Sequence, residues 1–460
     1  MAALRGAADG RVPPDHPKRL IWFCSTEHVA EQPDVLKKLR DEIGLTTIMP
    51  ESHICHTSGF RASDEIAARG PFEDWRSRAE LWPKAEQGIY PPVAGTVGGF
   101  DDAPLLRVIE MAREADIEVW GHIGLWCYGG NVFPEFAMED VEGRPLDMRY
   151  LKWGIGLCPS RRSINDWTRD CLVDVLARYD IDGFCVDHAR YPMPANLSSL
   201  AGCGCGSCQE AAARLGYDFP RMAEALLAFR NRLGDLSRRD AVRLADTPLA
   251  FWDLVACLGG EAAILDWFRF RATLLADRMG TFKRAVRAAS DDAKVFGSDV
   301  FAPSIALLGG HDYVAWAKGA DYLTGGSSAG GVVGWATAVT SVATEWAPAL
   351  CRAVTGLEEE EALRLVYRLF GYDDLGLPVT VREIEEGPLP LEAIYAREVG
   401  KLKALSGSSL PLYPPVSAQG DPEKVRELCS AVVDNGCDGA MLGLNPDRGD
   451  ILEVIGEAFG

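Results

Sequence analysis

The chain has 460 residues, of which 47% are hydrophobic and 25% are charged, which is typical of a folded protein with a large core. Its formal net charge of −20 repels phosphate backbones and anionic lipid, so we expect no nucleic-acid and no membrane partner. The same charge favours a neutral or cationic small molecule as the partner. The first twenty residues contain no apolar run of signal-peptide length, which predicts a cytoplasmic protein whose 13 cysteines are reduced.

Short apolar runs typical of β-strands alternate with amphipathic helical patterns along the chain. The first run, 20–24, precedes a helical pattern in which Val35, Leu39 and Ile43 share one face and Gly44 provides the stop signal. Seven further runs are centred near residues 47, 121, 185, 297, 322, 413 and 441. Alternation of this kind indicates a parallel sheet, and eight units favour a (β/α)8 TIM barrel over an open doubly wound sheet.

The predicted domain organisation is an N-terminal tail, 1–18, followed by one catalytic barrel over 19–460. Long insertions follow the second, fourth and sixth predicted strands, at 51–99, 193–260 and 325–387. In a barrel these segments lie at the C-terminal face, where active sites are built. They also offer enough surface for a homo-oligomer.

The most informative segment is DGFCVDHARYP at 182–192, an apolar strand that ends in Asp187 and continues into His188, Arg190 and Tyr191. Polar side chains at the C-terminal end of a barrel strand face a shared pocket, so a carboxylate there can take part in chemistry. The alternative is a structural role, in which Asp187 is the buried ion-pair partner of Arg190.

This segment resembles the fourth-strand motif DGxxxDxxRYP of bacterial glycoside-hydrolase-like barrels, and the segments 157–160 and 297–313 are also similar to that group. The resemblance covers most of the chain, from Arg19 to about Asn445. It implies a carbohydrate-active TIM barrel in which Asp187 is the first candidate nucleophile or acid. The segment is also similar to the DGxDxDxE motif of chitinase-like barrels, but Ala189 stands where their acidic Glu would be, which argues against chitinase-type chemistry.

Cleavage of a glycosidic bond needs a second carboxyl group beside Asp187. Asp299 ends the fifth predicted strand and is the best placed, because neighbouring strands bring their ends together; the alternative is that it caps a loop. Glu51, just after the second strand, and Glu27, just after the first, are the other candidates. The seventh strand ends in LYPPVSAQGD without a Glu, unlike the large retaining-glycosidase clan, whose nucleophile is a Glu at that strand.

Aromatic, histidine and charged side chains near the strand ends predict a sugar pocket, with rings stacking on the C–H face of the substrate. The alternative for each is an ordinary core or hydrogen-bonded residue. The predicted substrate-binding residues are Trp22, Glu27, Glu51, His122, Trp126, His188, Arg190 and Tyr191.

Three clustered cysteines, Cys203, Cys205 and Cys208, form a CxCxxC motif. Thiolates this close in a reducing compartment suit a closed, tetrahedral structural zinc site. Cys158, 45 residues upstream, is the most attractive fourth ligand, and Cys127 and His188 remain alternatives. This layout is similar to the structural zinc site of some β-galactosidase barrels. The alternative is a group of free thiols, and we expect no organic cofactor.

These observations predict a glycoside hydrolase that cleaves a small intracellular glycoside or oligosaccharide, with Asp187 and Asp299 as the catalytic pair. Two other functions stay open. The first is a sugar lyase or isomerase with His122 or His188 as the base, and the second is a carbohydrate-binding barrel without catalytic activity. The distance between the two carboxyl groups discriminates between mechanisms, because retention needs about 5–5.5 Å and inversion about 6.5–9.5 Å.

Overall fold

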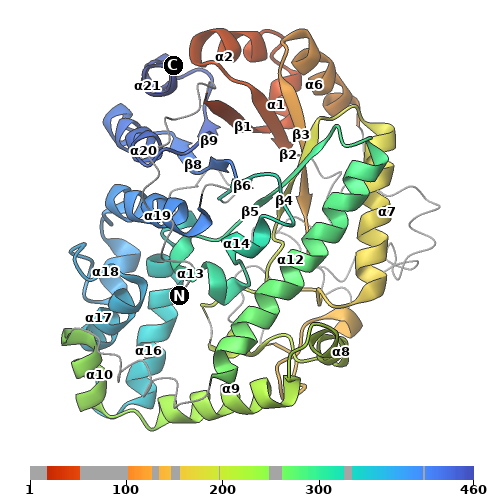
Figure 1. The fold of residues 1–460 in the computed structure, drawn as a ribbon. Helices are drawn as coiled ribbons and strands as arrows, with labels where there is room; N and C mark the ends of the chain where they lie inside the picture. Colours follow the sequence, from red (N-terminus) through yellow and green to blue (C-terminus); the bar gives the residue numbers. More distant parts are fainter. Residues whose placement is uncertain are drawn as a thin grey trace.

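The structure, a computed structural model, describes most of the chain (Figure 1). The described residues are 18–51, 102–126, 134–146, 156–195, 197–247, 262–325, 334–407 and 410–460. Almost all of the predicted tail and of the first insertion, 51–99, therefore lie outside the described residues. The same holds for Cys127.

Nine parallel strands form one nearly closed barrel in the spatial order β7-β6-β5-β4-β3-β2-β1-β9-β8 (Figure 1). They are β1 (Arg19–Ser25), β2 (Thr47–Glu51), β3 (Glu118–Gly124), β4 (Gly183–Asp187), β5 (Val295–Asp299), β6 (Leu323–Thr324), β7 (Leu412–Tyr413), β8 (Pro415–Ala418) and β9 (Gly439–Leu444). The predicted TIM barrel is confirmed, and every predicted strand centre falls in or beside an observed strand.

The seventh barrel strand is split into β7 and β8 by Pro414, which has no N–H to donate to a neighbouring strand. β7 pairs with β6, whereas β8 pairs with β9. The gap between these two ladders is bridged by β9, because the Met441 N–H donates to Pro414 O at 3.0 Å and the Asp438 N–H donates to Leu412 O at 3.0 Å. The two ends of the sheet thus meet around one kinked segment.

Helices cover the outside of the barrel, and α2 shows why they form. Its predicted apolar face is buried, and Gly44, with φ +70°, ends the helix in a left-handed conformation. The covering helices are α1 (Thr26–Ala30), α2 (Val35–Ile43), α6 (Ala103–Glu114), α7 (Arg162–Arg178), α12 (Ala263–Ala289), α14 (Tyr313–Trp316), α19 (Leu391–Ser406), α20 (Pro422–Asp434) and α21 (Gly449–Phe459). No described helix is both long and apolar enough to cross a membrane.

Further helices lie between β4 and β5 and between β5 and β7. They are α8 (Gly206–Arg214), α9 (Phe219–Gly234), α10 (Arg238–Asp246), α13 (Pro303–Ala306), α16 (Thr344–Ala353), α17 (Glu359–Phe370) and α18 (Val381–Glu386), with the π-helical turn η7 (Ala338–Ala343) leading into α16. The short 3-10 turns are η3 (Pro134–Phe136), η5 (Leu197–Ala201) and η6 (Leu307–Gly309). Helices α10, α16, α17 and α18 gather beside the barrel around a second apolar core (Figure 1).

Inside the barrel, an apolar layer lies below a polar one. The apolar layer is formed by Ile21, Met49, Trp120, Cys185, Tyr322, Tyr413 and Met441. The Trp120 and Tyr322 rings stack with their centroids 4.2 Å apart. Gly297 is required beneath this stack, because a Cβ there would lie 2.2 Å from the Tyr322 ring. Since side chains alternate along a strand, the inward positions nearer the C-terminal ends belong to His122, Asp187 and Asp299.

Candidate functional site

The C-terminal mouth of the barrel brings together three side chains from adjacent strands: His122 of β3, Asp187 of β4 and Asp299 of β5. One oxygen of each carboxyl group and a ring nitrogen of His122 all lie within 4.8 Å of one another. His122 Nε2 is 3.7 Å from Asp187 Oδ2, and His188 Nδ1 lies 2.5 Å from the same oxygen. The predicted pair Asp187 and Asp299 is therefore adjacent in the structure.

The two carboxyl groups differ in their ionisation. Burial alone would raise the pKa of Asp187, but His188, His122 and Arg190 together hold it below its usual value. Burial raises the pKa of Asp299 well above its usual value, and the negative charge of Asp187 raises it further. Two carboxylates this close cannot both ionise easily, so the charge of Asp187 disfavours ionisation of Asp299.

The two imidazoles beside Asp187 are buried, which disfavours their protonated form. Burial lowers the pKa of His122 and of His188, although the charge of Asp187 opposes this effect. A neutral His188 can still donate its Nδ1–H to the Asp187 carboxylate, which keeps that carboxylate anionic.

One oxygen of Asp299 is held by neighbouring side chains, and the other lies on the side of His122 and Asp187. The Thr324 hydroxyl donates to Asp299 Oδ1, and the Cys185 thiol lies 3.7 Å from the same atom. Within the described part of the chain, His122 Nε2 and Asp299 Oδ2 are buried and accept no N–H or O–H from another residue, although a protonated Asp299 can share its proton with the Asp187 carboxylate. Buried polar atoms are nearly always hydrogen-bonded, so His122 Nε2 marks a place for a bound molecule.

The backbone at this mouth is strained. His188, directly after Asp187, has φ +57°, and Trp126, two residues after β3, has φ +37°. Side-chain-bearing residues rarely adopt these values, and such conformations concentrate at functional sites.

A buried histidine that the sequence analysis missed, His311, connects the loops after β4 and β5. Its Nδ1 accepts from the Phe301 N–H at 2.9 Å, so its Nε2–H donates to Ala189 O at 3.1 Å. Burial lowers the pKa of His311 to about 3, which keeps this one tautomer in place. The Arg190 guanidinium lies 4.5 Å from the centroid of the Phe301 ring, between the same two loops. The signal for His311 was its place in the segment 297–313, which the resemblance had already singled out.

Several predicted pocket residues lie elsewhere. Trp22 faces the helices and belongs to the outer core, whereas Phe23 faces His122 at 5.3 Å between ring centroids. The Trp126 ring is buried, with Nε1 donating to Asn165 Oδ1 at 3.1 Å. Glu27 is exposed in α1. Glu51 ends β2, but its side chain is not among the described ones, and the substrate-binding set as a whole stays a prediction.

The four predicted metal-binding cysteines form one buried cluster. The sulfur atoms of Cys158, Cys203, Cys205 and Cys208 all lie within 4.8 Å of one another. Cys158 Sγ is 3.5 Å from Cys205 Sγ and 3.5 Å from Cys208 Sγ. The edges of a tetrahedron with Zn–S bonds of about 2.3 Å are about 3.8 Å long, so these spacings fit a bound metal ion. The structure thus shows a four-cysteine cluster able to hold a metal.

Two polar contacts support the sulfur atoms of this cluster. The Ser160 N–H donates to Cys158 Sγ at 3.4 Å, and Ser160 Oγ lies 3.1 Å from Cys208 Sγ. Tyr191, predicted to bind substrate, is fully buried, and the charges of Cys208, Cys158 and Cys203 add to the effect of burial in raising its pKa. Its ring contacts the guanidinium of Arg271, whose carbon lies 4.2 Å from the ring centroid.

No protein-family model and no curated protein sequence matches the chain. Among solved structures, it is similar to the glycoside hydrolase domain of PgaB (BpsB) from Bordetella bronchiseptica, with 11% identity over 93% of this chain and 94% of that chain and a TM-score of 0.47. It is similar to the catalytic domain of a beta-amylase from Paenibacillus polymyxa, with 11% identity over 96% and 95% of the two chains and a TM-score of 0.46.

A third similar structure is alpha-L-fucosidase isoenzyme 2 from Paenibacillus thiaminolyticus, with 12% identity and a TM-score of 0.45. The match covers 96% of this chain and 49% of the fucosidase chain. These are distant likenesses, and the class of the fold follows from the strand order of this chain itself: it is a TIM barrel.

Proposed function

We propose that the protein is a glycoside hydrolase that uses Asp187 and Asp299 as its catalytic pair. The observation that carries the proposal is the position of two carboxyl groups, with oxygens within 4.8 Å of each other at the C-terminal mouth of the barrel, whose surroundings shift their pKa values in opposite directions. Opposite shifts of two neighbouring carboxyl groups assign one the role of anion and the other the role of proton donor. Glycosidic cleavage needs this combination.

We propose a retaining mechanism, because the nearest oxygens of the pair lie closer together than inversion requires. Inversion needs a gap of about 6.5–9.5 Å, which leaves room for a water molecule, and retention about 5–5.5 Å. The nearest oxygens of Asp187 and Asp299 lie within 4.8 Å. In the proposed mechanism, Asp187 attacks the anomeric carbon and Asp299 protonates the leaving oxygen. Asp299, now ionised, then takes a proton from the water that releases the sugar from Asp187.

The neighbouring side chains hold and orient the substrate in this proposal. His122 Nε2 is the buried atom available for a substrate hydroxyl group, and Asp299 Oδ2, the oxygen that does not accept from Thr324, faces the leaving oxygen. His188 orients the nucleophile through its contact with Asp187 Oδ2. The net charge of −20 favours a neutral or cationic glycoside or small oligosaccharide over an acidic one.

We further propose that the four-cysteine cluster holds a structural zinc ion. Four sulfur ligands close the coordination sphere and leave no open position for catalysis, so the metal would stabilise the fold. Four buried thiols that must remain reduced to bind it suit a reducing compartment such as the cytoplasm.

A screen of aryl glycosides and natural oligosaccharides tests the proposed hydrolase. We expect at least one glycoside to be cleaved, with the first-formed product keeping the anomeric configuration of the substrate in a time course of proton NMR spectra. Inversion of configuration would contradict the assignment of Asp187 as nucleophile.

The unpartnered Nε2 of neutral His122 keeps one alternative open, a sugar lyase or isomerase that uses this histidine as the base. The same NMR experiment separates the two functions. A lyase gives an unsaturated product and an isomerase changes the sugar without adding water, whereas a hydrolase releases two saturated products.

A further inference from the structure

A completely buried arginine, Arg271, lies in α12 against the Tyr191 ring. The Arg271 side chain is 0% exposed, and its Nη1 donates to the carbonyl oxygens of Leu308 at 3.1 Å and Leu200 at 3.5 Å. Within the described part of the chain, Nε and Nη2 have no hydrogen-bond partner and no carboxylate pairs with the guanidinium. A buried cation without a compensating charge is strongly destabilising, so its presence requires an explanation.

The residues in contact with Arg271 are close to the cysteine cluster in the chain or in its electrostatics. Its guanidinium carbon lies 4.2 Å from the centroid of the Tyr191 ring, and the Tyr191 hydroxyl is itself buried without a partner among the described residues. Leu200, whose carbonyl oxygen also accepts from Trp267 Nε1 at 2.8 Å, is three residues before Cys203. Burial lowers the pKa of Arg271 to about 10, and the charges of Tyr191, Cys203 and Cys208 oppose that effect.

The missing charge is supplied when the cluster binds metal. Four thiolates carry four negative charges and zinc carries two positive charges, so a zinc tetrathiolate has a net charge of −2. We propose that Arg271 is the counter-charge of this centre, a role that rests on the zinc site proposed above. Ser160 supplies neutral hydrogen-bond donors to the same sulfur shell.

This assignment accounts for the buried guanidinium of Arg271. Without metal, Arg271 is a buried cation that destabilises the fold, and with metal it compensates a buried dianion. Arg271 also lies on Tyr191, in the loop that follows Asp187, so the charge pair connects the metal centre to the catalytic loop. Groups of this kind around a metal site typically change its affinity by about 10- to 100-fold.

The test compares Arg271→Met, which keeps the length and removes the charge, with Arg271→Lys, which keeps the charge. Arg284→Met, the same change at an exposed position of α12, is the matched control. We expect Arg271→Met to speed the loss of zinc to a chromogenic chelator by at least about tenfold, with Arg271→Lys and Arg284→Met close to wild type.

The same substitution in a Cys158→Ser/Cys208→Ser background gives the second readout. In the zinc-loaded wild type, Arg271→Met should lower the Tm, whereas in the metal-free background it should leave the Tm unchanged or raise it. If the cysteine variant does not fold, the zinc-release rates of the single variants are sufficient to test the inference.

Three results would overturn the inference. Equal zinc-release rates for wild type and Arg271→Met would show that the guanidinium does not act on the metal centre. An equal loss of Tm in both backgrounds would make Arg271 a packing residue, with the zinc site intact. Wild-type protein without zinc by elemental analysis would remove the zinc site and the counter-charge together.

Discussion

The two carboxyl groups at the mouth of the barrel are chemically identical but have different surroundings. Asp187 has two imidazoles and a guanidinium near it, whereas Asp299 faces a hydroxyl, a thiol and the charge of Asp187. In the proposed mechanism, a difference in environment, and not in residue type, separates the nucleophile from the acid.

Asp187→Asn tests the nucleophile directly. The substitution keeps the shape and a hydrogen-bond acceptor for His188 but removes the charge needed for attack. We expect kcat to fall by at least about 10³-fold, or about 4 kcal/mol of transition-state stabilisation, a loss far larger than any fall in the folded fraction. The matched control is Asp182→Asn at the opposite end of β4, where the carboxylate accepts from the Val119 N–H at 2.9 Å. The control should lower the Tm and leave kcat near wild type.

A well-folded Asp187→Asn protein that keeps more than a tenth of the wild-type kcat would refute the assignment. A loss of activity that only follows the folded fraction would instead support the structural role of Asp187 considered from the sequence.

The pH dependence of kcat/KM follows from the same pair. Activity needs Asp187 ionised and Asp299 protonated. The pKa of Asp187 is below its usual value of about 3.9 and that of Asp299 is above it. In the acidic range, activity should therefore fall only at strongly acidic pH, where Asp187 gains a proton. In the basic range, activity should fall as the pH rises through the raised pKa of Asp299, where Asp299 loses its proton.

The fall in activity at basic pH tests whether Asp299 is the general acid. Asp299→Asn should abolish that fall, and it should spare glycosides with good leaving groups more than those with poor ones, because only poor leaving groups need a proton. A rate that rises with pH as a histidine loses its proton would favour the lyase or isomerase instead.

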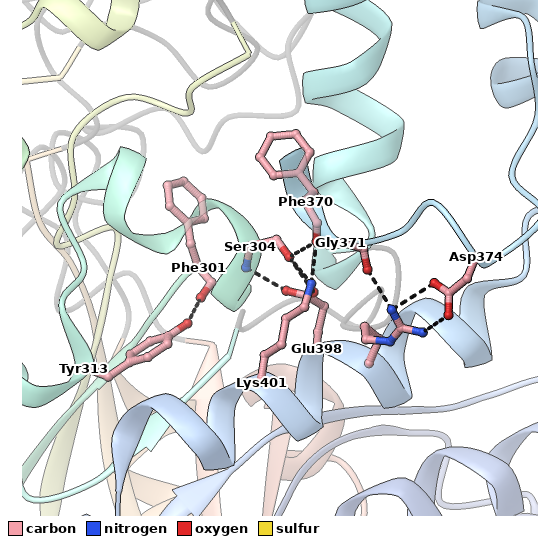
Figure 2. Close-up of polar contacts among 9 residues, drawn as sticks. Phe301, Ser304, Tyr313, Phe370, Gly371, Asp374, Glu398 and Lys401 are labelled. Carbon is pink, nitrogen blue, oxygen red and sulfur yellow. Dashed lines mark hydrogen bonds and ion pairs between the residues drawn. The ribbon is translucent and has the colours of Figure 1, made fainter. Parts of the chain in front are cut away.

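At the scale of elements, a polar clamp holds the loop that follows Asp299. Figure 2 shows Glu398 of α19 accepting from the Ser304 N–H at 2.9 Å and from Ser304 Oγ at 2.6 Å. Lys401, one turn later, donates to Glu398 at 2.9 Å and to Ser304 Oγ at 2.7 Å, and also to the carbonyl oxygen of Phe370 at the end of α17 (Figure 2). Three elements are thus tied together at one point.

Glu398→Gln should weaken this clamp. Glu398 is completely buried, and neutralising it removes the ion pair with Lys401 and turns one acceptor into a donor. We expect a loss of about 1–3 kcal/mol in the free energy of unfolding, measured by urea titration. Glu392→Gln on the same helix, whose partner Lys424 is mostly exposed, should change it by less than about 1 kcal/mol. Equal effects of the two substitutions would show that the buried cluster adds no stability.

The barrel strands could be predicted from sequence because buried parallel strands are continuous apolar runs. Because both faces of such a strand are apolar, the sequence does not show which face points inward. Trp22 and Phe23 are both apolar, and only the folded barrel shows that Phe23 faces His122. The ends of β4 and β5 were predictable, since Asp187 and Asp299 stand where apolar runs stop.

Long-range contacts set the limit of the prediction. Cys158 was named as a fourth ligand from its spacing, and the structure brings its sulfur to the other three. Arg271 lies 63 residues after Cys208, and no local pattern relates the two. The split of the seventh strand required knowledge of its neighbours, because the prolines mark a break without telling which strand each half pairs with.

On the scale of the whole molecule, the zinc centre should stabilise the folded chain, since bound metal adds its binding free energy to folding. Protein purified without added metal should contain about one zinc ion per chain, and a strong chelator should lower its Tm. The Cys158→Ser/Cys208→Ser variant is the control, and the chelator should leave its Tm unchanged. A chelator-insensitive wild-type protein would leave four free thiols as the better description.

The closure of the barrel also determines when the chain can fold. β1, the first strand, pairs with β2 and with β9, the last strand, and Arg19 lies opposite Gly439. A Cβ at Gly439 would lie 1.8 Å from Arg19 O, so β1 and β9 are closely packed where they pair. During synthesis β1 emerges early and keeps one unpaired edge until the C-terminal strand arrives. Barrel closure therefore waits for the synthesis of β9, and until then the unpaired edge of β1 is open to edge-to-edge association.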